Sequence, residues 1–336
     1  MNIAINGFGR IGRATFKAVL LNKRKDLKVV AINDLTDTKT LAHLLKYDSC
    51  YGEFGTEIKF TKDSLIIGGK KYPVFAEKDP LNLPWGKLSV DIVIESTGIF
   101  RAKDTAGLHL KAGAKKVIIS APAKDGIKTV VMGVNEDRIK KTDKLISNAS
   151  CTTNCLAPVT ECIRQAFGIK KAIMTTVHSY TADQNLVDGP HKDLRRARAA
   201  AVNMVPTTTG AAIAVTETIP SLRDKFDGMA IRVPTPVASL CDIVFITKKK
   251  VDAKRVNDCF KKAARSARLK NILAVSDEPL VSSDYIGNPY STIVDLDLTK
   301  VVDGDLVKVV AWYDNEWGYS NRLVDLCEYI EKKKLL

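Results

Sequence analysis

The chain has 336 residues, of which 45% are hydrophobic and 27% charged, with a formal net charge of +14. This length suggests roughly two domains of about 150 residues each, and the composition is ordinary for a soluble globular protein with a full core. No apolar run approaches the ~18 residues that a membrane helix needs, and no internal repeat or low-complexity linker is present.

The cysteines and histidines exclude further classes of protein. Seven cysteines, an odd number without framework spacing, argue against a secreted disulfide scaffold. None of the four histidines lies within metal-ligand spacing of another, so we expect no metal site. The sequence opens directly on MNIAINGFG, without a basic and apolar leader, which predicts a cytoplasmic location.

The positive charge favours anionic ligands such as phosphates and dinucleotides, and it could also attract RNA. The lysine runs at Lys248–Lys250 and Lys332–Lys334 have no aromatic residues between them that could stack on bases. This pattern favours a solvated basic surface over a nucleic-acid site.

The first 150 residues alternate short β-branched segments with helical patterns, such as Arg10–Leu21 and Asp104–Ala112. Gly68 and Gly69 at the centre of Leu65–Val74 predict a hairpin. The alternation predicts a doubly wound, Rossmann-type α/β domain with a parallel sheet over residues 1–150. The expected strands are Ile3–Asn6, Lys28–Asn33, Asp91–Ser96, Lys116–Ser120, Thr129–Val134 and Leu145–Asn148.

Residues 151–315 show a different pattern, in which long strands predominate. It predicts an α+β domain with a mainly antiparallel sheet, whose last two strands flank a turn at Lys300–Asp305. Apolar residues at helical spacing predict an amphipathic helix over about 316–333, which packs back on the first domain. The expected strands are Ala172–Tyr180, Gly228–Pro234, Asp242–Lys248, Thr292–Thr299 and Leu306–Tyr313, and the expected helices are Thr152–Phe167, Ala211–Ile219 and Ala253–Leu269.

A glycine-rich stretch, GFGRIG from Gly7 to Gly12, joins the first strand to the first helix. Glycine permits a tight turn and a close approach of a pyrophosphate to the backbone, and the helix N-terminus offers free N–H groups. Asp34 closes the second strand, where a carboxylate bonds ribose hydroxyls and repels a 2′-phosphate. The stretch predicts an NAD site, the alternative being turn glycines and a strand-end cap.

The segment SNASCTTNCLAPV carries Cys151 and Cys155 four residues apart. A disulfide, a metal site, core packing and a nucleophile are the alternatives for such a pair. Ser150, Thr152 and Thr153 make a polar surround that suits a reactive thiol at Cys151. Cys155 falls one helical turn later, and we expect it to be buried as packing.

Seven segments of the chain stand out as motifs: NGFGRIGR, ASCTTNC, HSYTADQ, PHKDLRRARAAA, PTTTGAA, RVPTP and WYDNEWGYSNR. Together these motifs resemble those of phosphorylating glyceraldehyde-3-phosphate dehydrogenases. The similarity runs from residue 2 to about residue 330 with the motifs in order. It implies oxidative phosphorylation of glyceraldehyde 3-phosphate to 1,3-bisphosphoglycerate with NAD reduction. In that family the residue matching Cys151 is the nucleophile, which forms a hemithioacetal and then a thioester, and the residue matching His178 is its base.

The nucleophile must be ionised to react. Lowering a thiol pKa from about 8.5 to about 6 takes roughly 3.4 kcal/mol. A helix N-terminus supplies at most ~2 kcal/mol. We therefore expect a cationic partner, His178, to supply the remainder for Cys151.

The resemblance also implies two anion sites and a set of cofactor contacts. Inorganic phosphate would be held by Ser150, Thr152, Thr209 and Gly210, and the substrate phosphate by Thr181 and Arg232, helped by one of Arg195, Arg196 and Arg198, of which we favour Arg196. The expected cofactor contacts are Gly7, Gly9, Arg10, Ile11, Gly12, Asp34, Lys78, Thr97, Ser120 and Asn315.

Residues 180–205 resemble a family loop that lies against a neighbouring subunit, which implies a homotetramer. Gly189 and Lys78 depart from the leucine and arginine that are frequent at these positions, and both lie near the expected adenosine pocket. The rival hypotheses are an erythrose-4-phosphate dehydrogenase, an RNA-binding or adhesion role of the basic surface, and a catalytically inactive relative.

Overall fold

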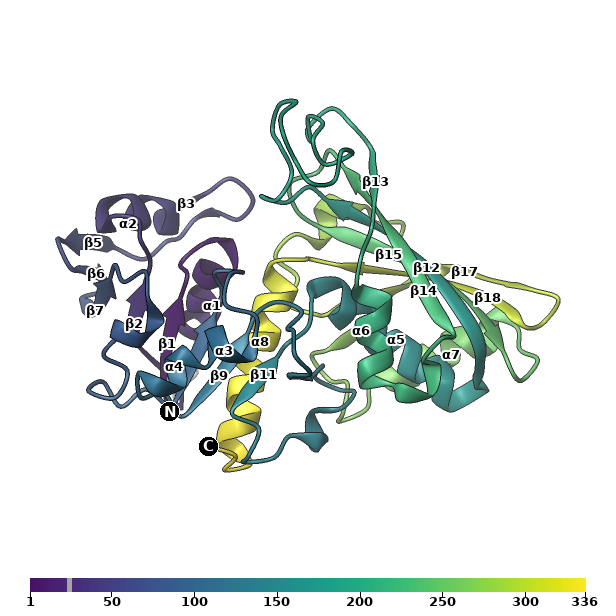
Figure 1. Ribbon diagram of the computed structural model, residues 1–336. Coiled ribbons are helices and arrows are strands. Elements are labelled where there is room, and N and C mark those ends of the chain that lie inside the picture. Colours follow the sequence, from purple (N-terminus) through teal and green to yellow (C-terminus); the bar gives the residue numbers. More distant parts are fainter. Residues whose placement is uncertain (23–25) are drawn as a thin grey trace. The chain divides into compact units, whose positions relative to one another are not determined.

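The computed structural model describes residues 1–22 and 26–336, which form two compact units (Figure 1). The first unit comprises Met1–Val130, Glu136–Ala149 and Ser320–Leu336. The second unit comprises Val131–Asn135 and Ser150–Tyr319. Over the described residues, no helix has the length and apolar character required to cross a membrane.

The first unit is built on a sheet with strand order β10-β11-β9-β8-β1-β2-β7-β6-β5. The strands from β10 to β7 pair in parallel, and β6 and β5 are added antiparallel through hairpins. Gly68 and Gly69 have φ of +54° and +79° and form the predicted β6–β7 turn. The strands are β1 Asn2–Asn6, β2 Lys28–Asn33, β5 Ile58–Thr61, β6 Ser64–Ile67, β7 Lys70–Phe75, β8 Ile92–Glu95, β9 Lys116–Ile119, β10 Lys128–Thr129 and β11 Leu145–Ser147, with a separate pair β3 Tyr47–Asp48 and β4 Gly52–Glu53.

The helices of the first unit connect these strands. Helix α1 spans Arg10–Leu21, as predicted, and leads from β1 to β2. Its C-cap Asn22 donates through Nδ2 to Asn321 Oδ1 at 3.0 Å, which ties α8, Trp317–Lys332, to the first unit. The other helices are α2 Thr38–Lys46, α3 Lys103–Ala106 and α4 Leu108–Lys111, with 3-10 turns at Pro80–Asn82 and Glu136–Arg138.

The second unit is built on a sheet with strand order β13-β14-β12-β15-β18-β17-β16. Most neighbours are antiparallel, and the β14–β12 and β17–β16 pairs are parallel. This confirms the predicted fold class of a parallel, Rossmann-type sheet plus a mainly antiparallel one. The strands are β12 Ile169–Ser179, β13 Val205–Thr207, β14 Phe226–Val233, β15 Ser239–Thr247, β16 Leu273–Ser276, β17 Thr292–Val302 and β18 Leu306–Tyr313.

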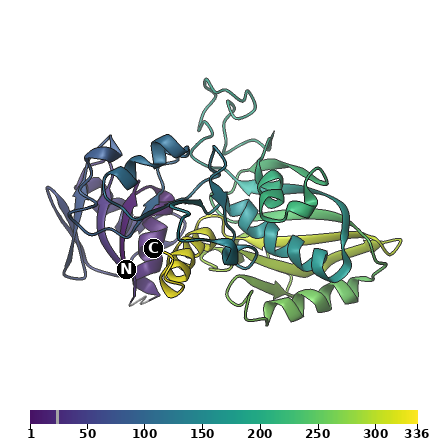
Figure 2. The same cartoon turned by 60° about the horizontal axis from the view of Figure 1, so that its bottom comes forward.

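Helices cover one face of this second sheet (Figure 2). Along β15 every second residue is buried, including Cys241, Ile243 and Phe245, because successive side chains of a strand point to opposite faces. The intervening residues, such as Val244, are only half-buried. The helices are α5 Cys151–Phe167, α6 Ala211–Thr218 and α7 Ala253–Ala264, with 3-10 turns at Pro220–Leu222 and Ser282–Tyr285.

Two predicted elements are shorter than expected, and the segments left outside them contact each other. The strand expected at Thr129–Val134 shrinks to Lys128–Thr129, and the helix expected at Ala253–Leu269 ends at Ala264. Arg268 donates to the carbonyl oxygens of Gly133 (2.9 Å) and Val134 (2.6 Å). These two carbonyl groups bond to Arg268 instead of to a neighbouring strand. Arg268 itself lies in a turn beyond the end of α7.

The helix expected at Asp104–Ala112 is divided at Gly107 into α3 and α4. A glycine in a helix interior weakens the helix relative to alanine. At Gly107 a Cβ atom would lie 2.5 Å from the Lys103 carbonyl oxygen, so the close packing of this turn excludes a side chain.

Candidate active site

The three glycines of the first loop serve different purposes. Gly7 has φ of +91°, and a Cβ there would lie 2.7 Å from Thr97 N. A Cβ on Gly12 would lie 2.1 Å from the Gly7 carbonyl oxygen, so α1 packs on the loop only through glycine. A Cβ on Gly9 would meet nothing within 4 Å. The packing of the chain therefore requires Gly7 and Gly12, and the space beside Gly9 suits a ligand that approaches the backbone.

The surroundings of this loop fit a dinucleotide. Gly9 is the N-cap of α1 and supplies no capping side chain, and the first turn of α1 holds no acidic residue that would repel a phosphate. Asp34 Oδ2 accepts from Phe8 N at 2.7 Å, which fixes the carboxylate beside the loop. The donors and the acid are those that NAD needs for its pyrophosphate and ribose.

The other expected cofactor residues are distributed as follows. Arg10 pairs with Asp48 at 2.9 Å, and Ile11 lies in the first turn of α1. Thr97 lies two residues after the carboxyl end of β8, Ser120 directly follows that of β9, and Lys78 is exposed. All of these belong to the first unit, whereas Asn315 belongs to the second.

Cys151 is the first residue of α5, and its Sγ lies 3.4 Å from His178 Nε2. Ser150 is the N-cap, and its Oγ accepts from Thr153 N at 3.1 Å. The residue before the cap, Ala149, has φ of +56°, a left-handed conformation that turns the chain sharply into the helix. Cys155 is fully buried, as predicted for a packing residue.

Hydrogen bonding fixes which nitrogen of His178 carries the proton. Nδ1 lies 2.7 Å from the Ser179 carbonyl oxygen, which can only accept, so Nδ1 donates to it. Arg232 Nη1 also lies 3.1 Å from Nδ1, but its two hydrogens have acceptors in the Ser179 carbonyl, likewise at 3.1 Å, and Thr181 Oγ1. With the proton on Nδ1, the neutral ring presents the lone pair of Nε2 to Cys151.

The electrostatics of the pair differ from the sequence expectation. Burial raises the pKa of the Cys151 thiol to about 11, although the charge of Arg232 acts to lower it. Burial, together with Arg232, lowers the pKa of His178 to about 3. These shifts favour a thiol beside a neutral imidazole, with Arg232 as the nearby positive charge, whereas the sequence predicts a cationic His178.

Three of the residues expected at the substrate-phosphate site are joined through Asp183. Arg232 Nη1 donates to Thr181 Oγ1 at 2.9 Å, and Thr181 Oγ1 donates to Asp183. Arg196 pairs with Asp183 and donates through Nε to Thr207 Oγ1 at 2.9 Å. Arg195 and Arg198 are exposed, so Arg196 is the member of the basic run that lies in this network.

The residues expected to hold inorganic phosphate are less closely grouped. Thr152 Oγ1 lies 2.9 Å from the buried Tyr313 hydroxyl, which is also 2.9 Å from Thr176 Oγ1. Thr209 Oγ1 accepts from Ala211 N at 3.2 Å, beside the α6 N-cap Gly210. The Thr152 hydroxyl thus points into the core, and its backbone N–H at the start of α5 is the group placed for an anion.

Asn315 is held in a fixed orientation. Its Oδ1 accepts from the hydroxyls of Ser179 and Ser239, each at 3.0 Å, and the side chain is buried. The amide nitrogen of Asn315 therefore points away from the two serines. It is a donor of the kind that suits the carboxamide oxygen of a nicotinamide.

Sequence reasoning missed three residues that organise this site. Ser179 fixes the His178 tautomer through its carbonyl, Asp183 joins Thr181 to Arg196, and the Tyr313 ring lies edge-on to His178 with centroids 6.0 Å apart. All three lie within the motifs HSYTADQ and WYDNEWGYSNR. Their position inside those motifs was the available signal.

A Rossmann-type unit with a dinucleotide loop, together with a cysteine–histidine pair at a helix N-terminus, defines an NAD-dependent oxidoreductase that uses a cysteine. Residues 1–103 match the family model "Glyceraldehyde 3-phosphate dehydrogenase, NAD binding domain", and residues 150–315 match "Glyceraldehyde 3-phosphate dehydrogenase, C-terminal domain". The chain belongs to the glyceraldehyde-3-phosphate dehydrogenase family.

Curated relatives match over nearly the whole chain. The glyceraldehyde-3-phosphate dehydrogenase of Geobacillus stearothermophilus is 56% identical over 336 residues, covering 100% of this chain and 99% of the relative. That of Thermotoga maritima is 56% identical over 330 residues, covering 98% and 99%. Glyceraldehyde-3-phosphate dehydrogenase 1 of Bacillus subtilis is 54% identical, covering 100% and 99%.

Proposed function

We propose that this chain oxidises glyceraldehyde 3-phosphate with NAD and inorganic phosphate, giving 1,3-bisphosphoglycerate. The observation that carries the proposal is the Cys151–His178 contact of 3.4 Å at the start of α5, in a chain that matches the family models of both domains. The thiol supplies the nucleophile that an aldehyde oxidation through a thioester requires.

In the first step Cys151 Sγ adds to the aldehyde carbon as its proton passes to His178 Nε2. Nε2–H then donates to the carbonyl oxygen, which becomes the hydroxyl of a hemithioacetal. Because Nδ1 donates to the Ser179 carbonyl, the lone pair of Nε2 faces Cys151 Sγ and can take the thiol proton.

NAD, when bound, accepts the hydride that leaves the hemithioacetal carbon. His178 Nε2 takes the hydroxyl proton as the carbon–oxygen double bond forms, and Cys151 is left as a thioester. Phosphate attack on that carbon releases the Cys151 thiolate and forms the acyl phosphate. The N-cap Ser150 and the backbone N–H groups at the start of α5 support the oxyanion.

For the substrate phosphate we propose Arg232, Thr181 and Arg196. Arg232 is held against the Ser179 carbonyl and the Thr181 hydroxyl, so its guanidinium is oriented before a ligand arrives. Asp183 orients Arg196 in the same network. A guanidinium fixed in this way binds phosphate at a smaller entropic cost.

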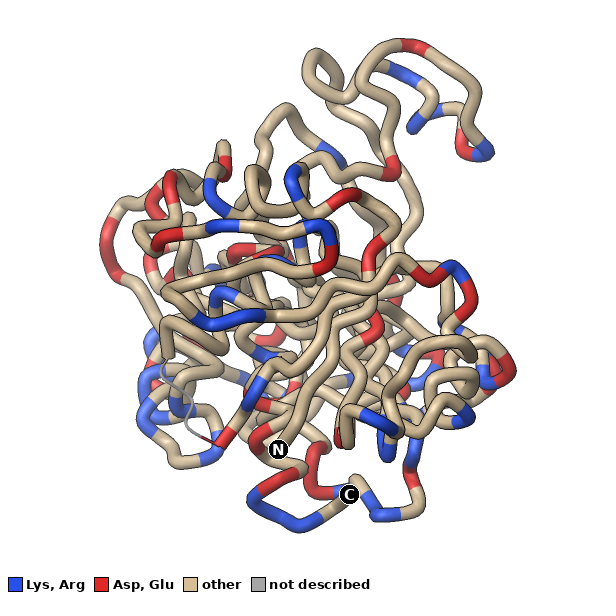
Figure 3. The backbone as a smooth tube through the Cα atoms, turned by 90° about the vertical axis from the view of Figure 1, so that its left-hand side faces the viewer, with Lys and Arg blue, Asp and Glu red and all other residues tan. Residues whose placement is uncertain are grey.

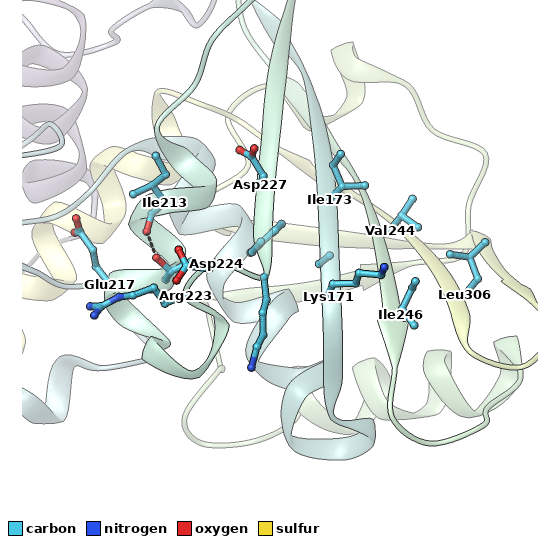
Figure 4. Close-up of a pocket in the computed structure, with 14 residues that line it drawn as sticks. Lys171, Ile173, Ile213, Glu217, Arg223, Asp224, Asp227, Val244, Ile246 and Leu306 are labelled. Atoms are coloured by element: carbon cyan, nitrogen blue, oxygen red, sulfur yellow. Dashed lines mark hydrogen bonds between the residues drawn. The ribbon is translucent and has the colours of Figure 1, made fainter.

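We propose a homotetramer, supported by apolar side chains that a single chain leaves exposed. In the segment between β12 and β13 they include Leu186, Leu194 and Met204, with exposed fractions of 76%, 80% and 76%. A second group lines a hollow of about 1010 Å³ in the second unit, between α6 and the strands β12, β14, β15 and β18 (Figure 4). Exposed apolar patches of this kind mark protein interfaces. The hollow is lined in part by Ile173, Ile213, Val244, Ile246 and Leu306.

The basic charge supports a solvated surface better than an RNA site. Figure 3 shows Lys and Arg interspersed with Asp and Glu along the backbone. Within the lysine runs, Lys250 pairs with Asp303 at 3.4 Å and Lys332 with Glu328 at 3.7 Å. Local pairing of this kind reduces the field that a polyanion would follow.

The test follows NADH formation by purified protein with NAD and glyceraldehyde 3-phosphate, with and without inorganic phosphate. We expect sustained turnover only with phosphate. A single burst near one NADH per site, unchanged by phosphate, would remove the phosphorylating step. Faster turnover of erythrose 4-phosphate would reassign the substrate.

A further inference from the structure

A row of buried polar side chains crosses the first sheet beneath the expected cofactor edge. Glu95, Asn6 and Asn33 are the last residues of β8, β1 and β2, and the strand register places Asn6 beside both of the others. Their exposed fractions are 1%, 1% and 5%. Polar groups buried at this depth destabilise a protein unless every one is hydrogen-bonded.

The hydrogen bonds run along the row without a break. Asn33 Nδ2 donates to Asn6 Oδ1 at 2.7 Å, and Asn6 Nδ2 donates to Glu95 Oε2. At the outer end, Asn33 Oδ1 accepts from Glu77 N at 2.9 Å, and Asn33 Nδ2 also donates to Glu77 O at 2.9 Å. The row therefore fixes the relative positions of β8, β1, β2 and the residue before Lys78.

The opposite end of the row is closed by His109 and Trp85. The indole Nε1–H of Trp85 can only donate, so His109 Nδ1, 3.0 Å away, is the acceptor. His109 Nε2 then carries the proton and donates to Glu95 Oε2 at 3.0 Å. His109 is fully buried, so this tautomer is set by the protein alone.

The second oxygen of Glu95 holds Thr97. Glu95 Oε1 accepts from Thr97 N at 2.8 Å and from the Thr97 hydroxyl. Four donors thus use both oxygens of the carboxylate, which leaves none for a ligand. Gly7 packs closely against the same segment, because a Cβ atom added at this position would lie 2.7 Å from Thr97 N.

Each strand of the row is followed at once by expected cofactor contacts: Gly7 after Asn6, Asp34 after Asn33, and Thr97 two residues after Glu95. We propose that Glu95 is a positioning residue for NAD, which holds the glycine loop, Asp34 and the Thr97 turn in one geometry without touching the cofactor. This inference rests on the proposed function only in taking NAD to bind at this edge.

The physical basis is the asymmetry between acid and amide. Glu95→Gln keeps the size of the side chain but replaces one acceptor oxygen with a donor NH₂. That group would face two donors, either those of Thr97 or those of Asn6 and His109. A buried donor left without a partner destabilises its surroundings, so the Thr97 turn or the row must shift.

The first test measures the Kd of NAD by isothermal titration calorimetry. The protein is first treated with charcoal to remove any bound nucleotide. Asp91→Asn is the matched control, because Asp91 precedes β8 at its other end and accepts from Asn2 N at 2.7 Å. We expect E95Q to raise the Kd at least about tenfold, with kcat at saturating NAD changed less than about twofold, and D91N to keep the wild-type Kd.

A second pair of variants addresses the end of the row that His109 closes. His109→Leu removes the donor to Glu95, whereas His109→Gln can still donate to Glu95 and accept from Trp85. We expect H109L to weaken NAD binding and H109Q to restore most of it. Melting temperatures measured in parallel separate binding from general stability.

The inference is overturned if E95Q binds NAD as tightly as wild type, or if D91N loses as much affinity as E95Q. It is also overturned if the wild-type protein fails to bind NAD. A protein that binds NAD but shows no phosphate-dependent turnover would contradict the proposed function alone, and the Kd comparison would still decide the role of Glu95.

Discussion

Arg232 is a positive charge that acts on both Cys151 and His178, so replacing it gives the sharpest test of the site. Arg232→Gln removes the positive charge and keeps a polar side chain beside Thr181. In the structure, Arg232 acts to lower the pKa of Cys151 and also contributes to the lowered pKa of His178. The variant should therefore raise both pKa values.

The magnitude follows from the contacts. Arg232 Nη1 lies 3.1 Å from His178 Nδ1, and His178 Nε2 lies 3.4 Å from Cys151 Sγ. One imidazole ring joins these contacts, which puts the guanidinium within roughly 9 Å of the sulfur. At about 8 Å and an effective dielectric constant of about 20, a unit charge contributes about 2 kcal/mol. That energy corresponds to about 1.5 pH units in the pKa of Cys151.

The assay is the rate of Cys151 alkylation by iodoacetamide at pH 8, with mass spectrometry to confirm the modified residue. Iodoacetamide is uncharged, so the variant does not change its attraction to the site. Below the pKa the rate follows the thiolate fraction, and R232Q should react on the order of 10–30 times more slowly. Arg198→Gln removes an equal charge from an exposed position and should react as wild type. An R232Q rate equal to that of R198Q would refute the assignment.

Three further predictions concern stability and binding. Because the pKa of His178 falls from 6.5 to about 3 in the folded chain, this residue should lower the free energy of unfolding by up to about 1.4 kcal/mol per pH unit below pH 6.5, and H178N should flatten denaturant midpoints measured from pH 7 to 4. Gly12→Ala should destabilise the fold by about 1–3 kcal/mol, whereas Gly9→Ala should keep the melting temperature and weaken NAD binding in calorimetry. Cys155→Ala should cost about 1–2 kcal/mol in chemical denaturation yet retain turnover, while Cys151→Ala should lose turnover; equal activity of the two would contradict the site.

The elements that the sequence predicted well are bounded by local signals. Helix α1 follows a glycine loop, and strand β18, Leu306–Tyr313, follows an Asp-Gly turn, so both have the predicted bounds. The Gly68–Gly69 hairpin has the same origin. In each case the turn residues at the boundary carry the information within a few positions of the element.

What the sequence could not predict depends on residues far apart in the chain. Arg268 donates to the carbonyls of Gly133 and Val134, 135 and 134 residues away, in a segment that the sequence predicts as strand. Likewise, the charge state of His178 is set by burial and by Arg232, 54 residues away. The residues next to His178 in the sequence indicate which hydrogen bonds it can make. They do not show how deeply the imidazole is buried or which distant charges lie near it.

The acceptor that orients His178 is a main-chain carbonyl, that of Ser179. In sites where a carboxylate has this task, acid can protonate the orienting group and a point mutation can delete it. A peptide carbonyl does not titrate, and every residue type at position 179 would supply it. The backbone path of β12 therefore sets the orientation of the His178 imidazole. Neither a change of pH nor a replacement of the side chain at position 179 removes the carbonyl that holds it.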